Sequence, residues 1–435
     1  MHMKKIVVAT LLTVGLVVST LGVSGTSAAS PAPVSGVTSV GASNAASAGW
    51  ANWGIGKGQT FNDPRNSKKW KIIDKIKRTI KHTPGGQKIW VMTWNLQSKG
   101  IVKQLIRAHN RGVSVRLIMS RQLAKEQNGN GSFWTLTRGL KKGNAKRGWA
   151  RKSFTRTCSN SCRGWGGSMH SKFMMVSKAG KRSKIVSQGS ANFTHAAATR
   201  QWNDWYTVYE KGRVWRAYKQ VFKQSLKDKR FGAVQAWQDQ HNAWFAPFGN
   251  QGDKVMQLLN KVQCGGAVRS GVDGRTALRI ASSVFQNKRG LRIARKIKQL
   301  HNQGCNIRVV FTMMTNKIRN ALSGVPTRHL VYDWDSDGSF DRYLHMKVMT
   351  ISGNWNGDRD HRLVFNGSAN WSKIGAISDE QGMVVHLKWP EKQYAKHINY
   401  LFNTAPLIAR GTPDDYKSRG TNPYAGLELE LAGQG

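Results

Sequence analysis

The segments MHSKFMM at residues 169–175 and LHMKVMT at residues 344–350 decide how the rest of the sequence is interpreted. In each segment a His-x-Lys triplet precedes an apolar run that predicts a buried strand. Side chains two apart along a strand point to the same face, so the histidine and lysine of a triplet should lie side by side. A single triplet is typical of a strand-end histidine beside a solvated lysine, whereas two copies indicate a duplication. The residues concerned are His170, Lys172, His345 and Lys347.

Two further repeated segments support a duplication. A GSAN tetrapeptide follows each triplet, at 189–192 and again at 367–370. Upstream of the triplets, HNRGVSVR at 109–116 aligns with HNQGCNIR at 301–308, and a glycine closes a predicted helix at the same place in both. Because the segments occur in the same order twice, we interpret the chain as two copies of one unit.

Hydrophobic periodicity predicts the same local structure in both copies. The first copy contains a predicted helix over 68–82, a strand over 88–94, and a helix, turn and strand over 100–119, which form a β-α-β unit. The second contains a strand over 276–285 and a helix, turn and strand over 290–312. Alternating helices and buried strands predict an α/β fold of two similar α/β/α lobes with mixed sheets, related by a pseudo-two-fold axis.

The N-terminal residues predict export from the cell. Residues 1–29 combine a short basic start, an apolar run and small residues, which is typical of a signal peptide. Residues 30–48 are rich in Ser, Ala and Gly and predict a flexible lead-in. No later segment is apolar over the ~20 residues that a membrane span needs. We therefore expect a soluble protein that is secreted and extracellular.

The duplication sets the expected domain boundaries. We expect an N-terminal lobe at 49–226, a linker at 227–254 where periodicity is lost, a C-terminal lobe at 255–410, and a C-terminal tail at 411–435. Each lobe is expected to have its own hydrophobic core.

The four cysteines fit a protein that works outside the cytosol. Cys158 and Cys162 lie in a polar CSNSC loop, and Cys264 and Cys305 lie in the second half. A structural zinc site is an alternative, but the spacing differs from the paired CxxC of zinc ribbons. We predict two disulfides, one within each pair.

The net charge points to a polyanionic partner. The sequence has 68 Lys and Arg against 22 Asp and Glu, which gives +46. Nucleic acid, anionic lipid headgroups and phosphate-bearing wall polymers all repeat negative charges that Lys and Arg can neutralise. The alternative is that the charge serves solubility in an acidic or salty habitat.

The repeated motifs together predict a phosphate-binding site. Each copy supplies an imidazole, an ammonium group, small residues that allow close backbone approach, and an amide. If two such sets face each other, the ammonium and amide groups can hold the oxygens of a tetrahedral phosphate. One histidine can then attack phosphorus in line, while the other protonates the leaving oxygen.

Both copies resemble the HKD motif of the phospholipase D superfamily, HxKxxxxD followed by GSxxN. This resemblance covers nearly the whole mature chain. It implies a two-lobed fold with one active site at the lobe interface, a covalent phosphohistidine intermediate and no required metal or other cofactor. It also implies that His170 is the nucleophile and His345 the general acid, although the two roles can be exchanged. The residues implied to hold the phosphate are Lys172, Lys347, Asn192 and Asn370, with Ser190 and Ser368 in support.

One position of the motif differs in both copies. The aspartate of the HKD motif is replaced by Ser177 in the first copy and by Ser352 in the second. We expect these serines to affect local packing more than chemistry.

A different acid is then expected to orient each histidine, because a carboxylate that accepts the second imidazole N–H fixes the tautomer of the ring. Asp204 and Glu380 are the candidates, since they lie at similar distances beyond the GSAN segments.

An acidic segment, DWDSDGSFD at 333–341, precedes the second triplet. Asp333, Asp335 and Asp337 fit the start of a calcium-binding loop, but Leu344 stands where such a loop has its final glutamate. Calcium binding is therefore one interpretation, and a polar turn that shapes the cleft is the other.

These features predict a secreted phospholipase D-type phosphodiesterase, a phosphoric diester hydrolase. Secretion and the resemblance favour phospholipid headgroups as the substrate, while the net charge favours an extended polyanion, as for a metal-independent extracellular nuclease. A non-catalytic polyanion-binding protein that kept the fold is a third possibility. No obligate protein partner is evident.

Overall fold

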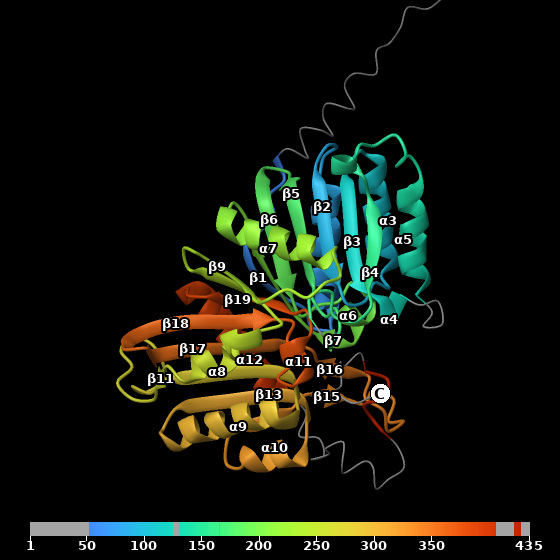
Figure 1. Cartoon of the computed structure of the whole chain (residues 1–435). Coiled ribbons are helices and arrows are strands. Elements are labelled where there is room, and N and C mark those ends of the chain that lie inside the picture. The colour runs from blue at the N-terminus through green and yellow to red at the C-terminus, as the bar shows by residue number, and fades with distance from the viewer. Residues whose placement is uncertain (1–51, 125–129, 165, 406–421, 428–435) are drawn as a thin grey trace, which may run out of the picture. The chain divides into compact units, whose positions relative to one another are not determined.

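The computed structural model describes residues 52–124, 130–164, 166–405 and 422–427. The predicted signal peptide, the predicted lead-in and most of the predicted tail lie outside these residues. The described residues belong to one compact unit. They form two lobes, each built on a mixed β-sheet (Figure 1).

The N-terminal lobe has a seven-stranded sheet in the order β1-β8-β6-β5-β2-β3-β4. Strands β2, β3 and β4 are parallel, and the other neighbours are antiparallel. The bounds are β1 Gly58–Phe61, β2 Lys88–Thr93, β3 Ser114–Ser120, β4 Phe154–Cys158, β5 Phe173–Ala179, β6 Arg182–Gly189 and β8 Asp204–Val208. The parallel strands require helical crossovers, which the predicted β-α-β unit supplies.

Amphipathic helices cover both faces of this sheet. On one face α2, α3 and α5 bury their apolar side chains, including Ile73, Ile76 and Ile80 of α2, at the spacing of a helix. Helix α7 packs on the opposite face. The bounds are η1 Ser67–Trp70, α2 Lys71–Lys81, α3 Lys99–Asn110, α4 Arg121–Ala124, α5 Gly131–Lys141, η3 Trp149–Arg151, α6 Ala196–Thr199 and α7 Gly212–Ser225.

The C-terminal lobe repeats this arrangement with a nine-stranded sheet. Its main order is β14-β13-β12-β17-β18-β19-β10-β9, and β11 pairs with β17. The strand bounds are β9 Val234–Gln238, β10 His241–Phe245, β11 Val262–Gln263, β12 Ala277–Phe285, β13 Asn306–Met314, β14 Thr327–His329, β17 Lys347–Trp355, β18 Asp358–Gly367 and β19 Gln381–Val385. The helices are η4 Gly249–Gln251, α8 Lys254–Leu259, α9 Asn287–Asn302, α10 Asn316–Ala321, α11 Ile374–Ile377 and α12 Lys388–Thr404.

The predicted repeat is confirmed element by element. The first copy has α2, β2, α3 and β3 where the sequence predicts them, and the second has β12, α9 and β13. The glycines that end the two aligned helices have positive φ, 94° at Gly112 and 91° at Gly304. This left-handed conformation favours glycine and stops a helix, which explains why the residue recurs at both turns.

The predicted linker is wrong in part, because it contains a β-hairpin. Strands β9 and β10 pair with each other, and β10 continues the C-terminal sheet beside β19. Trp244 is buried in this hairpin and stacks on Phe365, with ring centroids 5.1 Å apart. Trp237, on the other strand of the hairpin, is 49% exposed.

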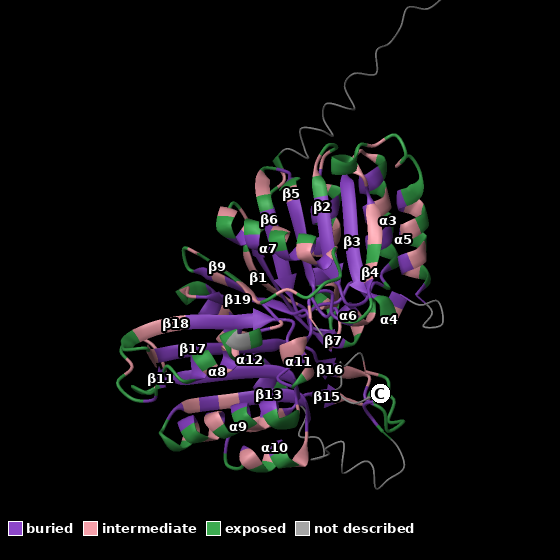
Figure 2. Cartoon of the chain, in the orientation of Figure 1, coloured by how far each residue is buried: buried purple, intermediate pink, exposed green. Residues whose placement is uncertain are grey.

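The lobes do not have fully separate cores, contrary to expectation. One hydrophobic cluster includes Trp90 and Phe173 of the N-terminal sheet together with Val348 and Met383 of the C-terminal sheet. Helices α7 and α12 contribute to the same cluster. Figure 2 shows buried ribbon continuing from one lobe into the other. Because separating the lobes would expose this apolar surface to water, the shared core holds the two lobes at a fixed spacing.

A small third sheet links the lobes directly. It has the order β15-β16-β7, with bounds β15 Val331–Tyr332, β16 Arg342–Leu344 and β7 Gln201–Trp202. Strand β7 of the first lobe runs parallel to β16 of the second. This link places the chain just before His345 against the chain that follows the first GSAN segment.

Both predicted disulfides are present. Cys158 is bonded to Cys162, and Cys264 is bonded to Cys305. Among the described helices, none has the length and apolar character needed to cross a membrane.

The contact between β18 and β19 leaves no room for a side chain at Gly382. A Cβ atom there would lie 2.0 Å from the Asn366 carbonyl oxygen and 2.4 Å from the Trp244 ring. We expect Gly382→Ala to lower the free energy of unfolding by about 1–3 kcal/mol, because a packed sheet relaxes poorly. Urea unfolding measures this, with Gly56→Ala as the control, since a Cβ at Gly56 meets no atom within 4 Å. Equal stability of the two variants would contradict the packing described here.

Candidate active site at the lobe interface

The six residues predicted to form the catalytic site come together from the two lobes. His170 and Lys172 immediately precede β5, while His345 precedes β17 and Lys347 begins it. The two asparagines follow β6 and β18. All six are buried, with exposed fractions of 0–1%: His170, Lys172, Asn192, His345, Lys347 and Asn370.

Each histidine is anchored by a main-chain contact that crosses between the lobes. The His170 N–H donates to the Asp379 carbonyl at 3.1 Å, and the His345 N–H donates to the Trp202 carbonyl at 2.9 Å. Met169 pairs with Asp379 and Leu344 with Trp202, both in parallel register. The two crossings are therefore equivalent, and each brings a histidine next to the residue that follows its partner: Glu380 or Asn203.

Glu380 orients His170, as the sequence predicts for an acid in this position. Its Oε1 lies 2.8 Å from Nδ1 of His170, and both side chains are fully buried. The second carboxylate oxygen of Glu380 accepts a hydrogen bond from the Ser368 hydroxyl. Because an ionised carboxylate only accepts, Nδ1 of His170 carries the proton and Nε2 presents its lone pair.

His345 is oriented by an amide, so the prediction that Asp204 orients one of the two histidines is wrong. Nδ1 of His345 lies 2.9 Å from Oδ1 of Asn203. The nitrogen of that amide donates to the Ala197 carbonyl at 3.0 Å, which fixes the amide with its oxygen toward His345. The Ser190 hydroxyl also donates to this oxygen at 2.9 Å. The second histidine therefore has a neutral partner.

The register of the sheets explains why Asn203, and not Asp204, is equivalent to Glu380. Gly189 pairs with Trp205, and Gly367 pairs with Gly382. Counting back two residues from each partner gives Asn203 and Glu380. Asp204 is instead equivalent to Gln381. Alignment of DWYTV at 204–208 with QGMVV at 381–385 is the signal in the sequence that identifies Asn203.

Asp204 makes other contacts in the interface. Its Oδ2 accepts from the Tyr394 hydroxyl at 2.8 Å and from the Asn366 amide at 3.1 Å. Burial raises the pKa of Asp204 above its usual value. Its equivalent, Gln381, bonds the Lys172 main chain, accepting from its N–H at 2.8 Å and donating to its carbonyl at 3.1 Å. Both residues thus support the site without contacting a histidine.

The two lysines are held in equivalent ways. Nζ of Lys172 donates to the His170 carbonyl at 2.5 Å, and Nζ of Lys347 donates to the His345 carbonyl at 2.6 Å. Trp94, which sequence reasoning missed, adds an aromatic wall beside His170 and Lys172. Its ring lies edge-on to His170, with centroids 5.2 Å apart, and 5.5 Å from Nζ of Lys172. The two ammonium groups bring positive charge to a buried interface.

Asn192 has the features expected of a residue that waits for a ligand. Its side chain is fully buried, yet neither atom of its amide has a hydrogen-bond partner among the described residues. A buried polar group without a partner costs about 1–3 kcal/mol, so such groups are rare and often functional. Asn370 is the equivalent residue, and its main-chain carbonyl accepts a hydrogen bond from the buried guanidinium of Arg289 at 2.7 Å.

Burial and charge shift the protonation of both dyads. Burial raises the pKa of Glu380 to about 7, although the ammonium group of Lys172 opposes the shift. Burial also lowers the pKa of His345 well below its usual value, and the ammonium groups of Lys347 and Lys172 lower it further. Before a substrate binds, His345 is therefore neutral at pH 7.

The two serines that replace the HKD aspartates lie away from the histidines in the hydrogen-bond network. The Ser177 hydroxyl accepts from the Lys88 N–H at 2.8 Å, and the Ser352 hydroxyl accepts from the Gly271 N–H at 3.1 Å. Each satisfies a main-chain donor at a neighbouring strand or loop, which is a packing role.

The acidic segment at 333–341 brings together a slightly different set of residues from the one predicted. Carboxylate oxygens of Asp333, Asp335 and Asp341 lie within 4.8 Å of one another. Asp337 instead accepts from the Ser339 N–H at 2.7 Å. Calcium binding at this segment stays a prediction.

Comparisons with known proteins agree with this geometry. Residues 76–226 match the family described as “Cardiolipin synthase, PLD-like domain”. No matching sequence is found among curated proteins. The fold resembles that of phosphatidylserine synthase from Haemophilus influenzae Rd KW20, with a TM-score of 0.51 at 11% identity, covering 81% of this chain and 89% of that one.

The fold also resembles polyphosphate kinase from Porphyromonas gingivalis, with a TM-score of 0.52 at 12% identity over 83% of this chain. The chain spans only 55% of the length of that kinase. At these identities the two structures show a shared fold alone. The family match over residues 76–226 and the shared fold agree with the resemblance to the phospholipase D superfamily that the repeated motifs predict.

Proposed function

We propose that the protein is a secreted phospholipase D-type phosphodiesterase that hydrolyses phospholipid headgroups through a phosphohistidine on His170. The observation that carries this proposal is the pair of buried His, Lys and Asn sets that face each other across the lobe interface. Such a site can hold a phosphate from two sides and place one imidazole on each side of phosphorus.

The partners of the two histidines assign their roles. Glu380 accepts the Nδ1 proton of His170, which leaves Nε2 as the nucleophile. The carboxylate also stabilises the positive charge that the ring gains when it is phosphorylated. Asn203 gives His345 no such charge, so protonated His345 is the stronger acid of the two. His345 therefore suits the transfer of a proton to a leaving group.

The reaction then proceeds in two displacements. Nε2 of His170 forms a bond to phosphorus while the bond from phosphorus to the leaving oxygen breaks, and His345 gives its proton to that oxygen. In the second displacement His345 takes a proton from water, the water oxygen bonds to phosphorus, and the bond between phosphorus and His170 breaks. The original protonation of His345 is restored, and no other reactant is needed.

Substrate binding favours protonation of His345, which takes its proton from solvent. Before substrate binds, burial and the two ammonium groups keep His345 neutral. The phosphate of a bound diester is negatively charged and opposes this effect, so protonation of His345 accompanies binding. Lys172 and Lys347 then pair with the phosphate oxygens, and Asn192 gains the hydrogen-bond partner that it lacks among the described residues.

The net charge of +46 supports a negatively charged substrate surface. Exposed tryptophans support a membrane interface, since indole rings favour the boundary between headgroups and acyl chains. Trp149, Trp334 and Trp389 are 65–69% exposed. Nucleic acid is the second candidate substrate, because the same charge neutralises a phosphate backbone. A polyanion-binding protein without catalysis is the third reading.

The first prediction from this proposal concerns the two histidines. His170→Ala and His345→Ala should each lower kcat on the order of 10³-fold or more, because the two rings act as one unit. The exposed His195, close in sequence to Asn192, is the matched control, and His195→Ala should keep turnover. Wild-type and variant proteins are incubated in EDTA with vesicles of phosphatidylcholine or phosphatidylglycerol and with plasmid DNA.

Release of headgroup alone supports the lipid substrate, and cut DNA alone supports the nuclease. If the folded wild-type protein releases neither headgroup nor cut DNA but binds the vesicles and the DNA, the protein is a polyanion-binding protein and the proposed enzymatic function is wrong. Near-normal turnover in either histidine variant would refute the composite site.

The second prediction concerns pH. Below about pH 7 Glu380 takes up a proton, and the neutral acid no longer stabilises the positive charge that the His170 ring gains when it bonds to phosphorus. The value of kcat/KM should therefore rise as the pH increases through about 7. Glu380→Gln should lower kcat roughly 10- to 100-fold and displace this rise, because an amide holds the ring without its charge. A rise that is identical in Glu380→Gln would exclude Glu380 as its source.

The third prediction tests the neutral partner of His345. Asn203→Asp should raise the pKa of His345, because a carboxylate stabilises the imidazolium. NMR titration of labelled histidine measures this shift, and Asp204→Asn serves as the comparison because Asp204 does not contact the ring. A larger shift in Asp204→Asn than in Asn203→Asp would contradict the hydrogen-bond pattern.

A further inference from the structure

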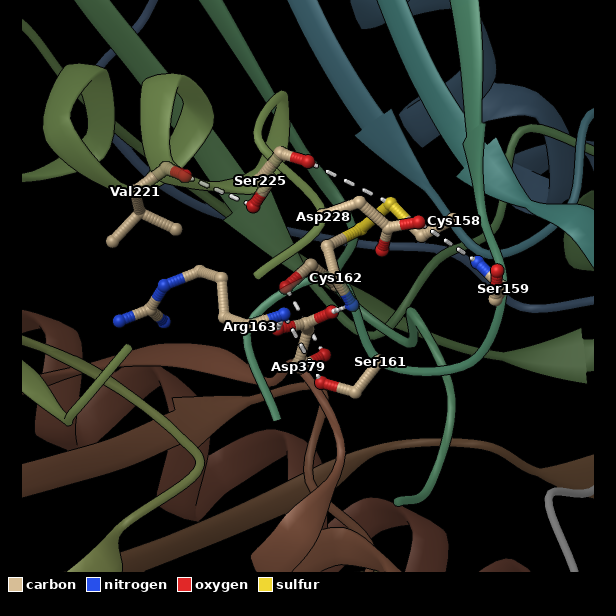
Figure 3. Close-up of a disulfide and its surroundings, with 10 residues drawn as sticks. Cys158, Ser159, Ser161, Cys162, Arg163, Val221, Ser225, Asp228 and Asp379 are labelled. Atoms are coloured by element: carbon tan, nitrogen blue, oxygen red, sulfur yellow. Dashed lines mark hydrogen bonds between the residues drawn. A yellow bond between two sulfur atoms is a disulfide. The ribbon is translucent and has the colours of Figure 1, made fainter. Parts of the chain in front are cut away.

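A short disulfide-closed loop of the N-terminal lobe forms hydrogen bonds to one side chain of the C-terminal lobe. The loop follows β4 and is closed by the bond between Cys158 and Cys162, both of which are buried. The side chain is that of Asp379, which points into the loop (Figure 3). Asp379 is itself 1% exposed and directly precedes Glu380.

The Asp379 carboxylate is satisfied by main-chain donors of this loop. One oxygen accepts from the Cys162 N–H, and the other accepts from the Arg163 N–H at 3.1 Å. The Ser161 side chain adds a further hydrogen bond. Successive N–H groups that converge on one anion form a concave binding site, and the disulfide closes the turn that presents them.

Arg163 holds the loop in place from the other side. Its guanidinium is fully buried and donates to Gln224 of α7 at 3.0 Å and to the Ala246 carbonyl at 3.0 Å. It also donates to the Gly232 carbonyl at 2.6 Å. The loop is therefore fixed to the helix and the hairpin between the lobes, and it cannot follow Asp379 if that residue shifts.

The main chain of Asp379 pairs with the segment that carries His170. Its N–H donates to the Ser168 carbonyl at 3.0 Å, and its carbonyl accepts from the N–H of His170 at 3.1 Å. The Ser171 hydroxyl donates to the same carbonyl at 3.1 Å. A displacement of Asp379 would thus move the His170 backbone and the Glu380 carboxylate at the same time.

Among the described residues, the other half of the site has no equivalent carboxylate held by a disulfide-closed loop. Trp202 occupies the position equivalent to Asp379, next to Asn203 and opposite His345. Its side chain packs in the shared core and carries no charge. The disulfide loop therefore acts only on the half that contains the charged dyad.

We propose that Asp379 is a positioning residue for the reaction: its carboxylate, held by the loop that Cys158 and Cys162 close, fixes Glu380 against His170. This inference rests on the proposed function only for its effect on turnover. A purely structural role, in which Asp379 joins the lobes, would alter stability and leave the dyad intact.

Asp379→Asn tests the carboxylate with little change of shape. An amide has one oxygen to accept with, and its NH₂ group faces a donor N–H, so one of the two loop contacts is lost. We expect kcat to fall roughly 10- to 100-fold with KM within about twofold, because the substrate contacts remain while the nucleophile is less well held. Unchanged kcat in the folded variant would overturn the proposal.

The two disulfides offer a matched pair of variants. Cys158→Ser with Cys162→Ser should lower kcat, whereas Cys264→Ser with Cys305→Ser should leave kcat unchanged, since that bond joins the start of β13 to the segment before β12. Thermal unfolding of both proteins measures the stability that each bond contributes. Equal loss of kcat in the two double variants would show that the disulfides act through stability alone.

A spectroscopic measurement separates this proposal from the proposed function. Proton–nitrogen NMR of ¹⁵N-histidine-labelled protein reports which ring nitrogen of His170 carries the proton. We expect a single Nδ1-protonated form in the wild type and a mixture of tautomers in Asp379→Asn and in Cys158→Ser with Cys162→Ser. A single unchanged tautomer in both variants refutes the positioning role, even if the wild type turns over none of the substrates tested.

Discussion

The hydrogen bond between His170 and Glu380 is the interaction on which the rest of the structure depends. It joins side chains 210 residues apart in the sequence and from different lobes. Both are fully buried, and a buried carboxylate is stable only when its hydrogen-bond geometry is good and its remaining acceptor sites are satisfied. The core shared by the two sheets, the crossing main-chain contacts and the Ser368 hydroxyl meet these conditions.

Duplication gives the site two equivalent backbones, and small differences give them different chemistry. Each histidine donates its main-chain N–H to the opposite lobe, and each lysine donates to the carbonyl of its own histidine. The orienting residue is charged in one half and neutral in the other. Glu380 favours a ring that becomes positively charged when it bonds to phosphorus, whereas Asn203 leaves His345 ready to release a proton. The division of labour thus follows from one side chain in each half.

The sequence was sufficient to predict the parts of the protein that local patterns determine. Periodicity predicts the helices and strands of both β-α-β units, and the repeated triplets and GSAN segments predict the six buried site residues. The β9 and β10 hairpin was missed because β9 is partly exposed and neither strand has a clear apolar alternation in its sequence. The shared core was missed because periodicity shows which face of an element is buried but not what covers it.

The errors at the site itself have a similar origin. Asn203 follows Gly189 by 14 residues, whereas Glu380 follows Gly367 by 13, so equal spacing would select Trp202. Asp204 is predicted because it is the acid nearest to that position, whereas the pairing of the strands shows that a one-residue insertion precedes Asn203. Trp94 and Asp379 reach the site through contacts with distant segments. Such contacts depend on how the lobes meet, which no local pattern records.

The most direct test is to find where the phosphoryl group is attached during turnover. The His345→Ala variant, in which hydrolysis of the intermediate is slowed, is mixed with a substrate that the wild type cleaves, denatured at alkaline pH and examined by peptide mass spectrometry. We expect a phosphoryl adduct on the peptide that contains His170, and none on His345 when His170→Ala is treated in the same way. An adduct on His345, or cleavage by the wild type with no adduct trapped on His170, would contradict the composite site with His170 as its nucleophile.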